Sequence, residues 1–195
     1  MRHTQDSNCP NTNTNTNTNT NSKALATPAP PADGADYRKA LSCFATGVTV
    51  VTTHWQGHDW GMTCNSFNSV SLNPRLVLWS IRRESSSLAA FTQGAGFTIS
   101  VLAQSQQALA RQFATGSMSE RFAGVRGQRE AGGRLRLEGC VAWFECDLHQ
   151  LVEAGDHTIM LCAVHDFGWQ DSPALGFWRS RFGQFEPLEA PPPKP

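Results

Sequence analysis

The sequence predicts a mainly β fold, an antiparallel barrel with a few short helices packed outside it. Short segments rich in β-branched and aromatic residues recur along the chain, bounded by Gly, Pro, Asn or Asp. Residues 142–149 alternate with a period of two, which is typical of a strand, and Glu145 and Asp147 are expected on its solvent-facing side. The strands do not alternate with long helices, which argues against a parallel sheet.

The predicted domain begins with a helix and continues mostly as strands. The first helix spans Asp36–Phe44, is capped by Asp36 and should pack Tyr37, Leu41 and Phe44 inward. Further helices are expected at Ser85–Thr92 and Ser105–Phe113, with a short one at Glu120–Ala123 inside a Gly- and Arg-rich excursion. Strands are expected at Val48–Thr53, Trp60–Cys64, Leu76–Ile81, Phe97–Leu102, Ala142–His149, His157–Phe167, Leu175–Trp178 and Phe182–Phe185.

The two ends of the chain differ from this domain in composition. Residues 11–21 alternate strictly between Asn and Thr, and residues 24–35 are rich in Ala and Pro. Segments with so few apolar side chains cannot offset the entropy of ordering. We therefore expect a disordered tail at 1–35, one folded domain at 36–188 and a Pro-rich disordered end at 189–195. No apolar segment follows Arg2, which argues against a secretory signal, and a cytoplasmic protein is expected.

Charge and cysteine usage exclude several classes of function. The chain has 16 basic and 16 acidic residues, scattered along it, so nothing favours a nucleic-acid or anionic-membrane partner. No apolar run is long enough for a transmembrane helix. The six cysteines include no C-x-x-C pair and are expected to be free thiols. His54 and His58 flank a predicted turn, so no metal site is expected.

The usual nucleotide and nucleophile fingerprints are absent. The sequence has no G-x-G-x-x-G after a strand, no G-x-x-x-x-G-K-[ST] loop and no G-x-S-x-G elbow. Any bound nucleotide must therefore be held by another arrangement.

The most informative segment is Gly61–Val77, in which a strand turns into small polar residues before a second strand. Small residues let backbone N–H groups approach a flat ring, and Thr63, Asn65 and Ser66 add side-chain hydrogen bonds. A flavin requires this combination of polar donors and apolar contact. The alternative is a polar turn that is capped by its own Asn and Ser side chains.

Two further segments carry candidate ligand-binding groups, and each also has a plain structural interpretation. Arg82–Leu88 follows a strand and opens a helix, where serine hydroxyls and an arginine can hold phosphate; the alternative is an ordinary serine N-cap. Gly155-Asp156-His157 forms a tight turn whose histidine can face a nicotinamide or simply water. Arg179–Phe182 either covers a ligand or forms an edge-strand surface.

Together and in this order, these segments resemble the flavin reductase family with the FMN-binding split-barrel fold, an antiparallel Greek-key barrel. The resemblance covers nearly everything after residue 35, and its Thr-x-Asn-Ser-Phe and Gly-Asp-His elements are fairly specific to the family. The matching segments are FATGVTVVTT (44–53), GMTCNSFNSVSLNPRLVLWSI (61–81), FTISVLAQSQQALARQFA (97–114), LEGCVAWFEC (137–146), AGDHTIMLCAVHDF (154–167) and ALGFWRSRFGQF (174–185).

The resemblance implies a role for each matching position. His157, the candidate catalytic residue, would orient the nicotinamide rather than act as a general base. The last strand has Phe182 where many relatives have Tyr, so a hydroxyl contact there is lost. Cofactor-binding positions would be Thr63, Cys64, Asn65, Ser66 and Phe67 at the isoalloxazine, Ser80, Ile81, Arg82, Ser86 and Ser87 near the phosphate, Ala103 and Gln106 closing that end, and Arg179 and Phe182 on the nicotinamide side.

The implied activity is reduction of FMN or FAD by NADH or NADPH, in a homodimer that supplies reduced flavin to a flavin-dependent oxygenase. Abundant Trp and Phe in a small barrel agree with a dimer interface. A non-enzymatic flavin-binding electron carrier is the main alternative, and a structural domain without a cofactor is a second one. The Gly-Asp-His turn favours the enzyme over the carrier.

Overall fold

The computed structural model describes residues 34–186 and 188. Contacts divide the chain into Met1–Gly34 and Ala35–Pro195, and the description below concerns the second unit. The predicted disordered ends lie outside the described residues, except that Gly34 and Ala35 belong to the first helix, α1 (Gly34–Ser42). In the described part of the chain no helix is long and apolar enough to cross a membrane.

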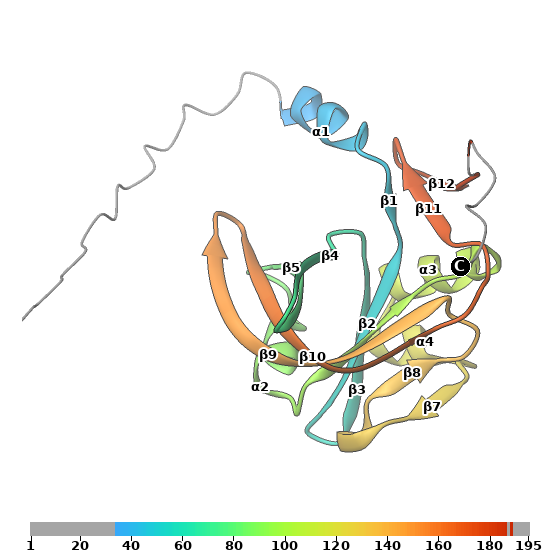
Figure 1. The fold of residues 1–195 in the computed structure, drawn as a ribbon. Helices are drawn as coiled ribbons and strands as arrows, with labels where there is room; N and C mark the ends of the chain where they lie inside the picture. Colours follow the sequence, from blue (N-terminus) through green and yellow to red (C-terminus); the bar gives the residue numbers. More distant parts are fainter. Residues whose placement is uncertain (1–33, 187, 189–195) are drawn as a thin grey trace, which may run out of the picture. The chain divides into compact units, whose positions relative to one another are not determined.

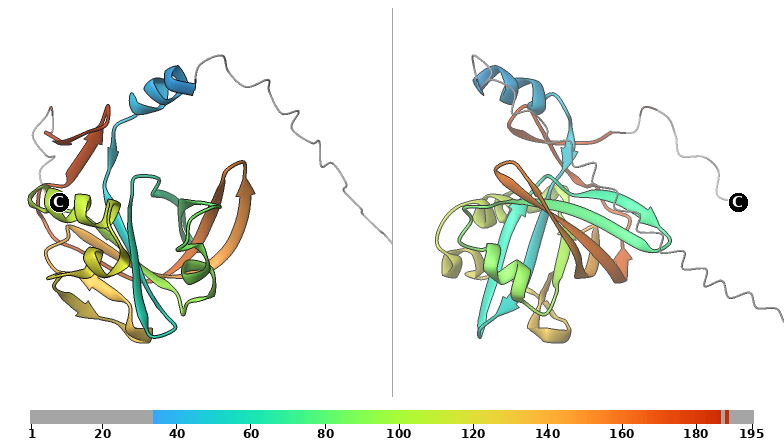
Figure 2. Two further views of the ribbon diagram at one scale, coloured as in Figure 1. Left: turned by 180° about the vertical axis from the view of Figure 1, so that it is seen from behind. Right: turned by 90° about the vertical axis from the view of Figure 1, so that its left-hand side faces the viewer.

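A seven-stranded antiparallel sheet forms the centre of the domain, as the sequence predicts (Figure 1). Figure 2 shows from two further sides that these strands curl rather than lie flat. Their order across the sheet is β3-β2-β6-β9-β10-β5-β4. The bounds are β2 Thr49–Trp55, β3 His58–Cys64, β4 Asn68–Leu72, β5 Arg75–Arg82, β6 Phe97–Val101, β9 Ala142–Ala154 and β10 His157–Trp169.

The two edge strands of this sheet are neighbours in the sequence. β3 ends at Cys64 and β4 begins at Asn68, yet they occupy opposite ends of the strand order. The link between them is Asn65–Phe67, and four Cα steps span at most about 14 Å. The sheet must therefore curl until its edges approach each other, which closes it into a barrel with a seam at this link.

Smaller elements surround the barrel. β1 (Thr46–Gly47), β11 (Leu175–Trp178) and β12 (Arg181–Gln184) form a second antiparallel sheet, and β7 (Gly127–Arg129) pairs with β8 (Leu135–Leu137). The helices are α2 Leu88–Gln93, α3 Gln107–Ala114 and α4 Met118–Phe122, with short 3-10 turns at Gln104–Gln106 and Ala131–Gly133.

Both faces of β2 are buried, because the strand separates two apolar clusters. Val51 belongs to the cluster around the fully buried Trp79, whose ring makes an edge contact with Phe91 of α2 at 5.0 Å. Val50 belongs to the other cluster, which α3 closes with Phe113. Burial on both faces fits the β-branched sequence of Val48–Thr53, which does not alternate between apolar and charged residues.

Three predictions about these elements need correction. The expected inward residues Tyr37 and Leu41 of α1, and Phe44 just after the helix, are 61%, 56% and 77% exposed, so the helix does not pack on the core of the domain. α2 begins at Leu88, later than predicted, because the serines before it form turns. Glu145 is buried rather than wet, because the equally buried Arg134 pairs with it.

Candidate functional site

A cleft of about 670 Å³ opens at the seam of the barrel. Its walls come from the end of β3, the link after it, β5 and the turn that follows, the α3–α4 region and the start of β10. The residues that line it are Met62, Thr63, Cys64, Asn65, Ser66, Ser80, Arg82, Glu84, Ser85, Ala114, Arg121 and His157. Residues predicted to contact the isoalloxazine, the phosphate and the nicotinamide therefore line one cleft. The predicted residues that do not line it are treated below.

Hydrogen bonds hold the seam residues in position. The Ser66 hydroxyl accepts from the backbone N of Ser80 at 2.9 Å and lies 3.3 Å from the carbonyl oxygen of the same residue, which ties the link to β5. The Thr63 hydroxyl donates to the carbonyl oxygen of Ala110 in α3 at 2.7 Å. These bonds fix the small polar residues against neighbouring elements, so the cleft is formed before any ligand binds.

Cys64 lines the cleft as a neutral thiol. The residue is 9% exposed, and its sulfur lies 3.0 Å from the Thr49 hydroxyl. Burial raises the pKa of the Cys64 thiol above its usual value, because the thiolate would be poorly solvated. A protonated thiol is a weak nucleophile, so Cys64 contributes shape rather than covalent chemistry.

Register places the arginine and the histidine side by side. His157 of β10 is directly opposite Arg82 of β5, and Gly155 provides the positive φ, 63°, that the turn before His157 requires. His157 Nδ1 lies 2.8 Å from Asp156 Oδ1. The hydrogen bond with His157 lowers the pKa of Asp156, so this carboxylate stays ionised and can accept a proton from Nδ1. In the tautomer with its proton on Nδ1, the other ring nitrogen, Nε2, is an acceptor.

An apolar hollow of about 180 Å³ continues from the polar cleft. It shares Thr63, Cys64, Asn65 and Ala114 with the cleft and is otherwise apolar, as Phe177 of β11 and Phe182 of β12 wall one side of it. The Phe182 ring also carries the Arg111 guanidinium 5.1 Å from its centre. The combined space has a larger polar part and a smaller apolar part.

Four predicted site residues lie beside the cleft without lining it. Phe67 stacks on Phe144 at 5.4 Å and packs on the core. Ile81 is fully buried, because the period of two in β5 turns it away from the face that presents Ser80 and Arg82. Ser87 is 3% exposed, and Ser86 is exposed to solvent away from the lining. Ser85 takes the lining position that was expected of them.

Three others are held at a distance by structural bonds. The Gln106 side chain accepts from the backbone N of Ala103 at 2.9 Å and donates to the carbonyl oxygen of Glu138 at 2.8 Å, so its amide closes a turn. Arg179 sits in the β11–β12 turn with a φ of 47°, and its guanidinium stacks 4.4 Å from the centre of the Trp178 ring. Neither the turn closed by Gln106 nor Arg179 lines the cleft.

Sequence reasoning missed several lining residues. Met62, Glu84 and Ser85 lie inside segments that were singled out, but not as site residues. Ala114 and Arg121 come from the α3–α4 region, where the sequence shows no ligand motif. Only the tertiary packing of α4 on β3 brings Arg121 into the cleft, through a hydrogen bond from Nη1 to the carbonyl oxygen of Gly61 at 2.9 Å.

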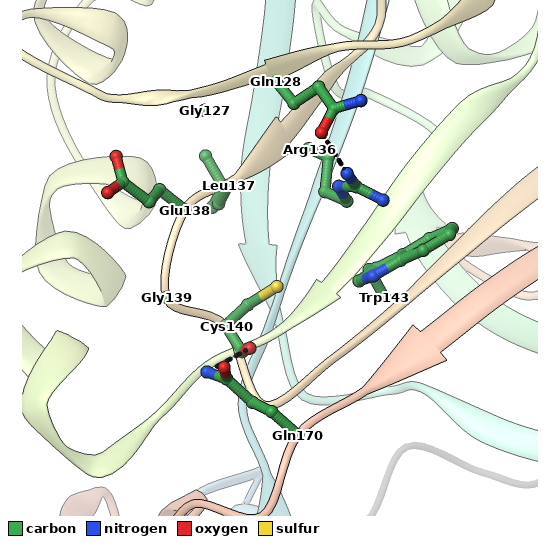
Figure 3. Close-up of a pocket in the computed structure, with 9 residues that line it drawn as sticks. All are labelled: Gly127, Gln128, Arg136, Leu137, Glu138, Gly139, Cys140, Trp143 and Gln170. Carbon is green, nitrogen blue, oxygen red and sulfur yellow. Dashed lines mark hydrogen bonds between the residues drawn. The ribbon is translucent and has the colours of Figure 1, made fainter.

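A separate hollow of about 400 Å³ lies between the β7–β8 hairpin, β9 and the end of β10 (Figure 3). None of the predicted site residues lines it. Its main feature is the Arg136 guanidinium, 4.2 Å from the centre of the Trp143 ring. Over residues 34–186 and 188, no group of three or more His, Cys, Asp or Glu side chains is arranged to hold a metal ion.

Comparison with known proteins gives a consistent result. Residues 41–186 match the family model described as flavin reductase like domain. The chain is 38% identical over 148 residues to the reductase component of a flavin-dependent trigonelline monooxygenase from Acinetobacter baylyi, covering 75% of this chain and 47% of that protein. It is 39% identical to FMN reductase (NADH) SmoA from Agrobacterium fabrum, covering 76% and 84%.

The chain spans about half the length of the first curated relatives that it matches, 47% and 48%. Among solved structures, NADH:FAD oxidoreductase SgcE6 from Streptomyces globisporus, in complex with NAD and FAD fragments, superimposes with a TM-score of 0.77 at 36% identity. That match covers 85% of this chain and all of the other, 100%.

Proposed function

Because the chain belongs to the flavin reductase-like domain family, we propose that it catalyses the reduction of FMN or FAD by NADH or NADPH. The observation that carries this proposal is the convergence of the seam residues Thr63–Ser66, Arg82 and His157 in one cleft. The split-barrel fold inferred from the sequence agrees with the superposition on reductases of this family.

The shape and chemistry of the cleft fit a flavin. Its volume, about 670 Å³ with a further 180 Å³ of apolar hollow, lies in the range of small-molecule sites. A flavin has a polar edge and an apolar dimethylbenzene end, and the space divides in the same way between Thr63–Ser66 and Phe182. Arg82, with Ser80 and Ser85 beside it, suits the phosphate.

A bound flavin supplies the hydride acceptor and NAD(P)H the donor, and the residues of the chain bind and orient. Hydride transfer needs no acid–base pair, so alignment is the main contribution of the protein. A hydrogen bond from His157 Nδ1 to the Asp156 carboxylate would leave Nε2 to accept an N–H from a carboxamide such as that of nicotinamide. The link Asn65–Phe67 and the buried side chain of Cys64 hold one wall of the cleft in place.

The test is to mix purified protein with NADH and excess FMN and follow the loss of the nicotinamide absorbance, repeating with FAD and with NADPH. We expect rapid turnover with at least one pair. Tight flavin binding without NAD(P)H oxidation would instead favour the electron-carrier alternative. The absence of both flavin binding and turnover would refute a flavin site.

Reduced flavin is proposed to pass to a separate flavin-dependent oxygenase. Relatives named as reductase components of monooxygenases support this, among them the trigonelline enzyme and stachydrine N-demethylase reductase subunit Stc3 from Rhizobium meliloti. Exposed residues such as Arg82 and Asn65 line the cleft, which leaves a path for release. After anaerobic reduction, ultrafiltration should recover reduced flavin in the filtrate; full retention with the protein would argue against transfer by diffusion.

We also propose a homodimer in which the apolar face of α1 meets the second copy. Tyr37, Leu41 and Phe44 follow helical spacing and are exposed. The backbone N of Arg179 donates to the carbonyl oxygen of Ser42, which anchors the end of α1 to the β11–β12 sheet. Analytical ultracentrifugation should show a dimer that Leu41→Glu converts to a monomer. Lys39→Glu on the same helix is the matched control, and an unchanged dimer in both variants would place the interface elsewhere.

The proposed location is the cytoplasm, where reduced nicotinamide nucleotides are available. Support comes from the free thiols of the described chain, Cys43, Cys64, Cys140, Cys146 and Cys162.

A further inference from the structure

The cleft contains an arginine that lies outside every motif of the sequence. Arg121, near the end of α4, lines the cleft together with Met62 and Thr63. Its Nη1 donates to the carbonyl oxygen of Gly61 at 2.9 Å, so the side chain is fixed to β3. A guanidinium has five N–H donors, and this bond uses only one of them.

No carboxylate of the described chain neutralises Arg121. Its neighbour Glu120 is turned away, because Glu120 Oε2 accepts from the backbone N and the hydroxyl of Ser117 at 2.7 and 2.8 Å. Arg121 Nε is buried and has no hydrogen-bond partner within residues 34–186 and 188. By contrast, five other arginines of the described chain pair with carboxylates: Arg83 with Glu153, Arg126 with Glu138, Arg129 with Asp59, Arg134 with Glu145 and Arg136 with Glu130.

One side chain of α3 contacts three carbonyl oxygens of the segment that carries Arg121. Gln112 Nε2 of α3 lies 3.0, 3.0 and 2.9 Å from the carbonyl oxygens of Glu120, Arg121 and Ala123, at the end of α4. The same helix α3 accepts the Thr63 hydrogen bond through Ala110. Gln112 therefore couples the position of α4 to the wall of the cleft.

Resting on the proposed flavin reductase function, we propose that Arg121 binds a phosphate group of a nucleotide in the cleft, with Gln112 as its positioning residue. The side chains that line the cleft include two arginines, Arg82 and Arg121, but only one carboxylate, Glu84, so the cleft favours anions. A guanidinium matches phosphate oxygens through its planar fork of donors.

Arg121 and Arg82 approach the cleft from opposite ends of the strand order. Arg82 ends β5, next to the edge strand β4, whereas Arg121 is bonded to the other edge strand, β3. Flavin and nicotinamide nucleotides bound together bring more than one phosphate group, so the cleft has a use for both arginines, on one shared phosphate or on two. The phosphate can belong to either nucleotide, and the experiment separates these sources.

The test compares ligands with and without phosphate in Arg121→Met. Dissociation constants for FMN and for riboflavin are measured from flavin fluorescence without NADH, so this readout does not depend on turnover. KM values for NADH and for 1-benzyl-1,4-dihydronicotinamide, which has no phosphate, are measured separately. Arg126→Met is the matched control, because Arg126 lies in the same excursion but does not line the cleft.

We expect Arg121→Met to weaken one phosphate-bearing ligand by about ten- to a hundredfold, the size of a hydrogen bond to a charged group, while its phosphate-free analogue changes less than about twofold. A loss for FMN but not riboflavin assigns the flavin phosphate, and a loss for NADH alone assigns the nicotinamide nucleotide. Gln112→Leu should show the same ligand pattern with a smaller effect, and Arg121→Lys should recover part of it.

Equal weakening of FMN and riboflavin would overturn the proposal, because Arg121 would then contact the ring. Unchanged binding and KM values for all four ligands would overturn it as well. If Arg121→Met fails to fold, Arg121→Lys and Gln112→Leu carry the same comparison. An inactive wild type that binds FMN would refute the reductase function alone, because the binding comparison still reports on Arg121.

Discussion

The Arg134–Glu145 ion pair is almost closed to solvent, and replacing Arg134 by Met should destabilise the domain strongly. The side chains are 5% and 9% exposed, with Nη2 of Arg134 3.3 Å from Oε2 of Glu145. Arg134 Nη1 also donates to the carbonyl oxygen of Ala95 at 2.7 Å. Met keeps the apolar stem of the arginine but leaves Glu145 without its charged partner inside the protein.

Removing one partner of a buried pair costs about 3–5 kcal/mol, because the remaining charge stays desolvated. Domains of this size have unfolding free energies of about 5–15 kcal/mol, so the loss is a large part of the total. Urea unfolding followed by Trp fluorescence should show a lower midpoint with an unchanged slope. Arg126→Met, which removes an exposed pair with Glu138, should change the unfolding free energy by less than about 1 kcal/mol.

The loss of unfolding free energy in Arg134→Met should also depend on pH. Desolvation and then the charge of Glu130 raise the pKa of Glu145, while Arg134 lowers it. A carboxyl whose folded pKa exceeds its unfolded pKa favours folding most when protonated, and this contribution is lost as pH rises through the folded pKa. Without Arg134 that pKa rises further, so Arg134→Met should lose more stability at pH 8 than at pH 5. A deficit below about 1 kcal/mol, or one equal at both pH values, would refute this reasoning.

Three further outcomes follow from the site and the core. His157→Ala should raise the KM for NADH several-fold while fluorescence titration shows nearly unchanged FMN binding; a loss of FMN binding instead would assign His157 to the flavin. Ser66→Ala leaves the backbone N–H of Ser80 without its acceptor and should cost about 1–3 kcal/mol in urea unfolding together with weaker FMN binding; wild-type values for both would show that the link is held by other contacts. Burial raises the pKa of Cys162 to about 12. A thiol reagent at pH 8 should therefore label the exposed Cys43 quickly and Cys162 only after unfolding, as mass spectrometry of digests would show. Equal labelling rates would contradict the burial of Cys162.

Most of the fold could be predicted from local patterns, because the strands carry them strongly. The strands that the sequence predicts lie close to their expected bounds, since β-branched runs and turn residues delimit them, although Ala142–Ala154 continues beyond its predicted end at His149. Strands β4, β7 and β8 were not predicted, because such short segments carry too little pattern. The burial of Glu145 could not be predicted, because its partner Arg134 lies on another element and pairing depends on tertiary packing. Helix α1 shows the converse, as an apolar stripe predicts burial but not against which surface.

The candidate site was predictable where one segment supplies several lining residues. Thr63–Ser66 are contiguous, and His157 follows a glycine turn, so short motifs reveal them. Arg121 had no such signal, because its place in the cleft depends on α4 packing against β3 over a separation of 60 residues. Ile81 was implied by the resemblance, whereas the two-residue period of β5 turns it into the core.

The cleft has a consequence for how the protein responds to its own ligand. Its walls come from residues 62–66, 80–85, 114–121 and 157, segments that meet only when the whole barrel has formed. A nucleotide that binds there binds the folded chain and has little to hold in the unfolded one. At a hundred times its dissociation constant it adds about 2.7 kcal/mol to the unfolding free energy. The amount of folded protein in a cell would then follow the supply of the nucleotide that the cleft receives.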